Sequence, residues 1–415
     1  MENIFFLIDV NSAYLSWEAA YHIQHGGKVD YRKVPSIVGG DPKKRKGIVL
    51  AKSIPAKKYN ISTGEAISEA LKKCPNLKII SPSYTRYIKA SNALIKMLKE
   101  YSPKVQRFSI DECFLELVVD QKRFINPVEI AYEIKERIKK ELGFTVNIGI
   151  STNKLLAKMA CDLKKPNMVH TLFKTEIKNK LWPLKVNKLF MVGKATYSKL
   201  KDLDINTIGE LANTDVEILK HFLKSHGQLI WEYANGIENS KINLNKYRQV
   251  KSIGNSTTIP YDLTKKQEAF LYILSLIEMV AMRLREKNLL CSLVSISIKN
   301  SEFLKYSHQK KLSYSTDLTN DIYNEAKSLF LSVWKKEPIR HIGVRVGSLS
   351  DNRFDQLSIW NNKNQKKLRK LDNTIDNLRL KYGEAIIKRS SFLHSDINSI
   401  NGGVQKEYPM MTSLL

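Results

Sequence analysis

Two groups of acidic residues lie at the end of, or inside, apolar runs, and they are the first candidates for chemistry. Asp9 follows the run Ile4 to Ile8, and the neighbours Asp111 and Glu112 interrupt Phe108 to Phe114. Three carboxylates gathered in one pocket repel one another unless divalent cations hold them, which is the arrangement of a two-metal phosphoryl-transfer centre. Neighbouring side chains of a regular strand face opposite ways, so Asp111 and Glu112 need a bend to serve one site. From the residues alone, Asp9 could instead be a turn or cap residue, and Asp111 and Glu112 could belong to an exposed hairpin.

The elements that must position these carboxylates are short strands and amphipathic helices. Runs of β-branched and aromatic residues predict strands over 4–10, over 108–119 (two strands or one bent strand) and over 146–150. Apolar residues at three- and four-residue spacing predict helices over 65–74, 86–101 and 129–142. We therefore expect one sheet covered by helices.

The rest of the chain changes character twice. Residues 181–240 predict a compact unit of short helices joined by glycines, without strands. Residues 245–349 predict a separate α+β domain of approximate order β-α-β-(β)-α-β. After it come a polar, basic stretch over 361–370 without an apolar face and a last amphipathic helix that ends near Tyr382. The predicted fold class is α+β and multidomain.

Composition restricts the function classes. The 415 residues are 43% hydrophobic, which suits two to four folded domains, and 68 Lys and Arg against 41 Asp and Glu give a net charge of +27. That charge favours nucleic acid over an anionic membrane as the partner. Four scattered cysteines without a C-x-x-C pair indicate a reduced, cytoplasmic chain, and no signal peptide or membrane span is expected.

Several ordered sequence blocks resemble those of one enzyme family. Residues 9–14, 109–112 and 149–158, followed by 162–167, resemble the Y-family translesion DNA polymerases, the DNA polymerase IV and UmuC-type group. Further agreeing blocks are 39–42 with 56–59, 251–256 and 340–345. The resemblance extends from Ile4 to about Leu349. It implies a low-fidelity DNA-directed DNA polymerase without proofreading that adds deoxynucleotides to a primer 3′ end, in DNA damage tolerance, the SOS response and mutagenesis.

The same resemblance implies the architecture of a right-hand polymerase. Its parts would be a palm over 1–17 and 79–180, fingers over 18–78, a helix-hairpin-helix thumb over 181–240, a little finger over 241–350 and a C-terminal tail with a clamp-binding motif over 351–415. The implied partners are primer-template DNA, a deoxynucleoside triphosphate and the sliding clamp, for a chain that is expected to be a monomer. Two rivals are weighed against this interpretation: a nucleotidyl cyclase or related palm-type transferase, and a non-catalytic DNA-binding or accessory protein.

The resemblance also assigns roles to the palm residues. Asp9, Asp111 and Glu112 correspond to the catalytic carboxylates that hold two Mg²⁺ ions, with Mn²⁺ as a substitute, and the carbonyl of Val10 corresponds to an extra metal ligand. Tyr14 corresponds to the steric gate that excludes a ribose 2′-hydroxyl. The alternative for Tyr14 is a core aromatic residue on the helix after the first strand.

Two lysines are implied to bind the nucleotide. Lys165, before Pro166 and Asn167, is similar to the family lysine that holds the triphosphate. In the fingers many members have Tyr-x-x-Arg, but this sequence has Ile54 and Lys57, so the tyrosine hydroxyl is absent and a point charge replaces a bidentate arginine.

Two regions are implied to contact DNA. Phe190 to Gly193 resembles the thumb turn whose amides contact a phosphate, with Met191 in place of the first glycine of the usual G-x-G. In the last domain the alternation of residues 342–347 places Arg345 on the open face of the sheet. The expected phosphate-tracking surface joins Arg345 to Lys251, Lys299, Lys305 and Lys310, with a generic solvated lysine face as the alternative.

A short motif follows the last predicted domain. Gln356, Leu357, Ile359 and Trp360 resemble the Q-L-x-L-F peptide with which bacterial polymerases bind the sliding clamp. The glutamine would pair with backbone groups, and the three apolar side chains would fill a pocket. A final strand or helix turn packed on the domain is the alternative.

Overall fold

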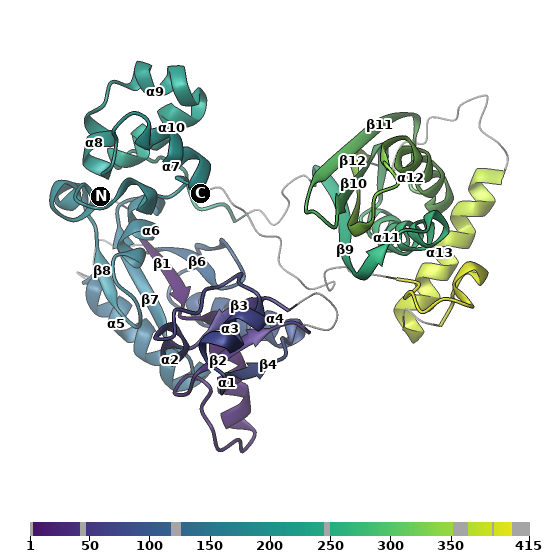
Figure 1. Ribbon diagram of the computed structural model, residues 1–415. Coiled ribbons are helices and arrows are strands. Elements are labelled where there is room, and N and C mark those ends of the chain that lie inside the picture. The colour runs from purple at the N-terminus through teal and green to yellow at the C-terminus, as the bar shows by residue number, and fades with distance from the viewer. Residues whose placement is uncertain are drawn as a thin grey trace. The chain divides into compact units, whose positions relative to one another are not determined.

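The computed structural model describes residues 3–41, 47–117, 126–244, 250–351, 364–383 and 386–400 (Figure 1). This part of the chain forms two compact units, one made of residues 3–40 and 48–244 and one made mainly of residues 250–400.

The first unit is built on a five-stranded sheet with the order β5-β6-β1-β7-β8. Its strands are β1 (Ile4–Val10), β5 (Val105–Arg107), β6 (Glu112–Leu117), β7 (Val146–Ser151) and β8 (Val169–Thr171). The central strand β1 pairs antiparallel with both β6 and β7, while β7 and β8 are parallel. The strand that carries Asp9 is therefore held on both sides.

Helices cover both faces of this sheet because β1 is apolar at every position before Asp9. Phe6 and Ile8 point into a core with α4 (Tyr84–Leu98), α5 (Pro127–Arg137) and the π-helical turn η2 (Ile138–Leu142). Phe5 and Leu7 point the other way, into a smaller cluster with Ala157 and Cys161 of α6 (Lys154–Asp162). A two-residue period thus divides one strand between two cores.

Two smaller structures complete the first unit. A three-stranded sheet has the order β3-β2-β4, with β2 (Ser36–Gly39), β3 (Val49–Lys52) and β4 (Lys78–Ile80). The helices beside it are α1 (Ala13–Gln24), α2 (Ile54–Lys57) and α3 (Ile67–Lys73). The helical structure expected after residue 181 contains α7 (Lys194–Lys201), α8 (Ile208–Asn213), α9 (Val216–Leu223) and α10 (Ser225–Ala234), preceded by the short turns η3 (Lys174–Glu176), η4 (Ile177–Leu181) and η5 (Val186–Lys188).

The helical structure is fastened to α6 at one end. The Asn153 side chain caps α6 through the backbone N–H of Leu156 and also donates a hydrogen bond of 2.9 Å to the carbonyl of Gly236. One buried side chain therefore fixes both the start of α6 and the end of the helical structure.

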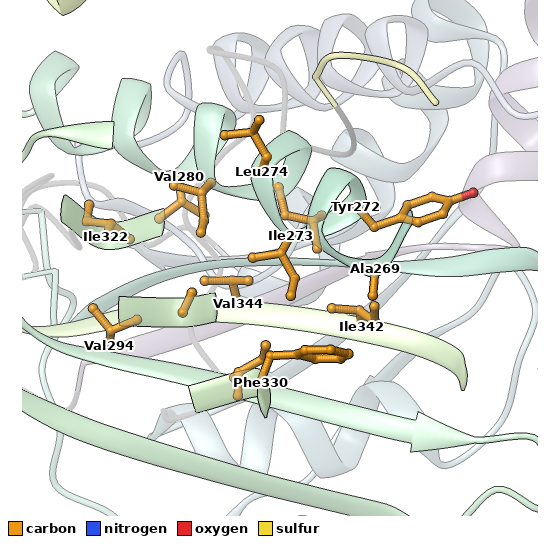
Figure 2. Close-up of a cluster of buried hydrophobic side chains, with 14 of the residues drawn as sticks. Ala269, Tyr272, Ile273, Leu274, Val280, Val294, Ile322, Phe330, Ile342 and Val344 are labelled. Carbon is orange, nitrogen blue, oxygen red and sulfur yellow. The ribbon is translucent and has the colours of Figure 1, made fainter. Parts of the chain in front are cut away.

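The second unit has a four-stranded antiparallel sheet with the order β11-β10-β12-β9. Its strands are β9 (Ser252–Leu263), β10 (Leu289–Asn300), β11 (Lys305–Thr316) and β12 (Ile339–Asp351), and its helices include α11 (Lys266–Glu286) and α12 (Thr319–Val333). Figure 2 shows Ile273 and Val280 of α11 above Val344 of β12, and Phe330 of α12 lies in the same buried cluster. The expected order β-α-β-(β)-α-β is confirmed, as is the α+β multidomain class.

A further helix, α13 (Asn364–Tyr382), is fixed to α11 by buried ion pairs. The Arg285 guanidinium contacts Asp376 at 2.6 Å and Asp372 at 3.2 Å, and Arg379 contacts Glu278 at 2.6 Å. Phe392, at the end of the short turn η6 (Ser390–Phe392), lies in the core of this unit.

One expectation about the C-terminal region is wrong. The sequence separated a polar stretch over 361–370 from the last helix, but α13 already begins at Asn364. Lysine, glutamine, leucine and arginine are all good helix formers, so the missing apolar face did not prevent a helix. No helix in the described part of the chain is long and apolar enough to cross a membrane.

Candidate active site

The backbone brings the three acidic residues together at one end of the first sheet. In the pairing of β1 with β6, Asp9 lies directly opposite Glu112. The backbone N–H of Val10 donates a hydrogen bond of 3.1 Å to the carbonyl of Asp111. Residues more than 100 positions apart in the sequence are therefore neighbours because of strand register.

The bend that the sequence required lies at residues 109–111, immediately before β6. The Ser109 hydroxyl donates to Asp111 Oδ1 at 2.5 Å and accepts from the backbone N–H groups of Asp111 and Glu112 at 3.3 and 3.0 Å. The sequence resemblance assigns no role to this serine, although a serine two residues before an aspartate is a typical turn former. Its hydrogen bonds fix the bend from which the side chains of Asp111 and Glu112 project.

Two lysines of α6 and the loop after it meet the carboxylates. Lys158 Nζ lies 2.6 Å from Glu112 Oε1, and Lys165 Nζ is hydrogen-bonded to Asp9 Oδ2 and lies 2.8 Å from Asp162 Oδ1. The Asp9 and Glu112 side chains are 13% and 17% exposed. Lys165 was singled out by sequence, whereas Lys158 and Asp162 were seen only as parts of a block.

The electrostatics are those of carboxylates crowded in a poorly solvated place. Burial raises the pKa of Asp9 to about 7, with the charges of Glu112 and Asp111 adding to the rise and Lys165 opposing it. Burial likewise raises the pKa of the Asp111 carboxyl, and the Glu112 charge adds to the rise. Burial lowers the pKa of Lys158, but the Glu112 carboxylate outweighs it and the net pKa is raised. Such sites are favourable for added positive charge.

The donor set suits a hard divalent cation, because carboxylate and carbonyl oxygens are the ligands that Mg²⁺ and Mn²⁺ take. Within the described residues, however, no group of three or more His, Cys, Asp and Glu side chains is arranged to hold a metal ion. Two of the three carboxylates are instead paired with lysine ammonium groups. The residues therefore fit the cation by donor chemistry and charge, and the metal assignment stays a prediction.

Tyr14 lies in the first turn of α1, five residues after Asp9. Its ring stacks on Tyr87 with centroids 4.5 Å apart and also contacts Trp17 at 6.0 Å. Tyr14 is half-buried, so one side of the ring belongs to the core. The aromatic packing fixes the orientation of the ring, and the steric-gate role stays a prediction.

Ile54 and Lys57, which the resemblance assigns to the fingers, lie on α2. Ser53 caps this helix by accepting from the N–H of Ala56, and Pro55 follows in its first turn. Ile54 and Lys57 are both exposed.

The turn over residues 190–193 has an unusual backbone conformation at Met191, where the resemblance leads us to expect a glycine. Met191 has a φ of 74°, in the left-handed region that favours glycine. Gly193 has an ordinary φ of −83° and is the N-cap of α7, with no side-chain hydrogen bond at the cap. The amides at the start of α7 are therefore presented at an exposed turn.

On the second unit, Arg345 is exposed while Val344 and Val346 are buried, as the alternation predicted. Lys305 pairs with Lys299 in the sheet, and Lys251 is exposed just before β9. The assignment of Lys310 to the same face is wrong. It lies opposite the buried Val294, and its ammonium is 3.0 Å from Glu325 of α12, on the helix side of the sheet. The clamp-motif residues Gln356 to Trp360 lie outside the described residues.

Comparisons with known proteins match most of the chain to one family. Residues 8–162 match the impB/mucB/samB family, and residues 250–359 match its C-terminal domain, so together more than half of the chain is matched. The chain is 48% identical to a DNA polymerase IV of Clostridium acetobutylicum over 95% of this chain and all of that protein. It is 37% identical to a DNA polymerase IV of Acetivibrio thermocellus over 95% of this chain and 98% of that protein.

A solved structure shares the fold. A chimeric Y-family DNA polymerase made from Dbh and Dpo4 matches with a TM-score of 0.71 and 22% identity, over 84% of this chain and all of that one. The family matches and the full-length relatives named DNA polymerase IV set aside the cyclase and accessory-protein alternatives. Two matched domains, full-length relatives and a shared fold show that the chain belongs to the Y family of DNA polymerases, whose general role is translesion synthesis, and that it is a DNA-directed DNA polymerase.

Proposed function

We propose that the polymerase adds deoxynucleotides to a primer 3′ end at the cluster of Asp9, Asp111 and Glu112, with low fidelity and without proofreading, in DNA damage tolerance and mutagenesis. The observation that carries this proposal is the register of β1 with β6, which places three half-buried acidic residues side by side. Burial and the neighbouring carboxylates raise the pKa of Asp9 and of Asp111, which destabilises the fold, so the presence of these acids favours a catalytic use.

The carboxylates of this cluster and the carbonyl of Val10 are the groups that would hold two Mg²⁺ ions. When bound, such ions lower the pKa of the primer hydroxyl and neutralise charge on the pyrophosphate leaving group. Two lysine side chains would contribute further positive charge for the nucleotide. Lys165 is hydrogen-bonded to the carboxylates of Asp9 and Asp162. By rotation of its side chain, it could exchange these carboxylate oxygens for the oxygens of a triphosphate. Lys57 would add a point charge from the fingers.

Discrimination and DNA binding follow from other residues. Tyr14 would exclude a 2′-hydroxyl by contact, since stacking on Tyr87 prevents the ring from moving aside. The amide at Gly193 and the side chains of Lys251 and Arg345 would bind backbone phosphates of the primer-template. In this proposal the first unit contains palm, fingers and thumb over the ranges given above, the second unit contains the little finger, and the protein acts as a monomer in the cytoplasm.

Single-nucleotide insertion tests the proposal. Purified protein is given a primer-template and one nucleotide at a time, opposite an undamaged base and opposite an abasic site, with Mg²⁺, with Mn²⁺ and with a chelator. The expected result is metal-dependent insertion that includes wrong nucleotides and proceeds at the abasic site, with no shortening of the primer. Insertion that survives chelation, or primer degradation, would contradict the proposal.

A further inference from the structure

Lys158 occupies an unusual position between the carboxylate cluster and the thumb turn. Its side chain is only 11% exposed, and its ammonium donates a hydrogen bond of 2.6 Å to Glu112 Oε1. The same ammonium lies 5.3 Å from the ring centroid of Phe108 and 5.5 Å from that of Phe190. One buried cation therefore contacts an acidic residue of the cluster and two aromatic faces.

The two aromatic rings belong to segments with different tasks. Phe108 immediately precedes the bend at residues 109–111, and its backbone N–H donates to the carbonyl of Glu112 at 3.0 Å. Phe190 begins the thumb turn that contains Met191 and ends at Gly193. The rings of Phe108 and Phe190 meet edge to face at 6.2 Å, and Phe190 stacks on Tyr233 of α10 at 6.3 Å. The thumb is thus in contact with the residue that leads into the catalytic bend.

This packing limits where the Lys158 ammonium can go. A lysine has four rotatable side-chain bonds, and an ammonium beside one carboxylate in solvent would sample many positions. Here the faces of Phe108 and Phe190 attract the cation, and the low exposure prevents water from replacing them. The hydrogen bond to Oε1 then restricts the torsions of the Glu112 side chain, which is longer and less constrained than an aspartate.

We propose that Phe190 and Lys158 are positioning residues for Glu112, through which the thumb turn is energetically coupled to the carboxylate cluster. The inference rests on the proposed catalytic role of Glu112. Neither residue is placed on the substrate; Lys158 acts on Glu112, and Phe190 acts on Lys158. A displacement of the thumb turn would loosen the ammonium and with it the carboxylate, and small errors in a ligand's position are expensive in rate.

The first arm of the test changes Lys158. Lys158→Met keeps the length of the side chain and removes the charge, while Lys158→Arg keeps the charge. Groups that orient a metal ligand typically contribute about tenfold to a hundredfold in metal affinity or activity. Lys158→Met should therefore raise the half-saturating Mg²⁺ concentration and lower kcat by that factor, with little change in KM for the nucleotide. Lys158→Arg should recover part of the loss.

The matched control is Lys154→Met, one turn earlier on α6. Lys154 is also buried, and its ammonium lies 5.8 Å from the ring centroid of Phe114, but it donates a hydrogen bond to the carbonyl of Lys241. The Lys154→Met variant should keep the half-saturating Mg²⁺ concentration of the wild type. Equal shifts in the Lys154 and Lys158 variants would mean that any buried lysine of α6 has this effect, and would overturn the inference.

The second arm changes Phe190 and measures coupling. Phe190→Leu keeps most of the volume and removes the aromatic face, so it should shift the Mg²⁺ dependence in the same direction as Lys158→Met but by less, about threefold to tenfold. DNA affinity without divalent metal should stay within about twofold. In the double variant, Phe190→Leu should add nothing to Lys158→Met, because the thumb contact acts through the lysine. Independent, additive effects, or a change confined to DNA affinity, would show that Phe190 only packs the thumb.

Failure of the inference is distinguishable from failure of the proposed function. If Glu112→Gln retains full insertion activity, the role of Glu112 is wrong whatever Lys158 does. If Glu112→Gln is inactive while Lys158→Met and Phe190→Leu both behave as wild type, only the positioning inference is wrong. A cooperative thermal transition for each variant establishes that loss of activity is not loss of fold.

Discussion

Replacement of Gly149 by alanine should force strand β7 and helix α6 apart. Gly149 lies in the middle of β7, and a Cβ atom built there would be 2.0 Å from the carbonyl oxygen of Ala157 and 2.4 Å from the backbone nitrogen of Cys161. Both atoms belong to the backbone of α6, so no side-chain rotation relieves the clash. An ordinary contact of about 3.4 Å would require α6 to move by more than an ångström from the sheet.

The expected cost is large because neither element has room to yield. Overpacking of a well-packed core typically costs about 1–3 kcal/mol, and a clash with backbone belongs at the upper end of that range. At about 2–4 °C per kcal/mol for a domain of this size, the melting temperature of the first unit should fall by about 6–12 °C. The same displacement carries Lys158 away from Glu112, so the insertion rate should also fall.

Scanning calorimetry of the Gly149→Ala variant measures the effect, with a reference transition in the second unit, which contains none of the affected contacts. Gly193→Ala is the matched control, because nothing lies within 4 Å of a Cβ at Gly193. Its melting temperature should fall by no more than about 4 °C, since alanine in place of an N-cap glycine costs up to about 1 kcal/mol. An unchanged transition for Gly149→Ala would refute the close packing of α6 on β7.

Three further predictions concern discrimination, DNA binding and the clamp. Tyr14→Ala should raise ribonucleotide insertion relative to deoxyribonucleotide insertion by orders of magnitude, since it removes a clash without adding an attraction; unchanged sugar discrimination would place the gate elsewhere. Arg345→Ala should weaken DNA binding and reduce the salt slope by about one, whereas Lys310→Ala should do neither, because that lysine faces α12; titrations from low to high salt decide between them. Loss of the clamp motif should abolish stimulation by a loaded clamp without changing the clamp-free rate, and equal stimulation would contradict the assignment. The residues to be changed to alanine together are Gln356, Leu357 and Trp360.

Local signals predicted the elements that carry the site. The apolar run before Asp9 gave a strand whose residues divide between two cores, and the acidic pair required the bend that Ser109 forms. These features depend on residues within a few positions of one another. Strand and helix patterns therefore sufficed for them.

The features that the sequence did not predict depend on contacts between distant segments. The pair of Lys158 with Glu112 needs α6 to lie against β6, 46 positions away in the sequence. Arg285 and Asp376 are 91 positions apart, so no local sequence pattern indicates that α13 packs on α11. Lys310 was placed on the wrong face for a local reason: no strand was predicted over 305–316, where the two-residue period puts Lys305 and Lys310 on opposite faces.

The most direct test of the central claim is the rate of single-nucleotide insertion by Asp9→Asn, Asp111→Asn and Glu112→Gln, measured together with primer-template affinity. These substitutions keep shape and remove charge, so insertion should fall below a few per cent of wild type while the dissociation constant for DNA stays within about twofold. Asp162→Asn is the control, because it pairs with Lys165 but is not one of the proposed metal ligands, and it should keep most of the rate. Insertion near the wild-type rate by any of the three variants would contradict the proposed site.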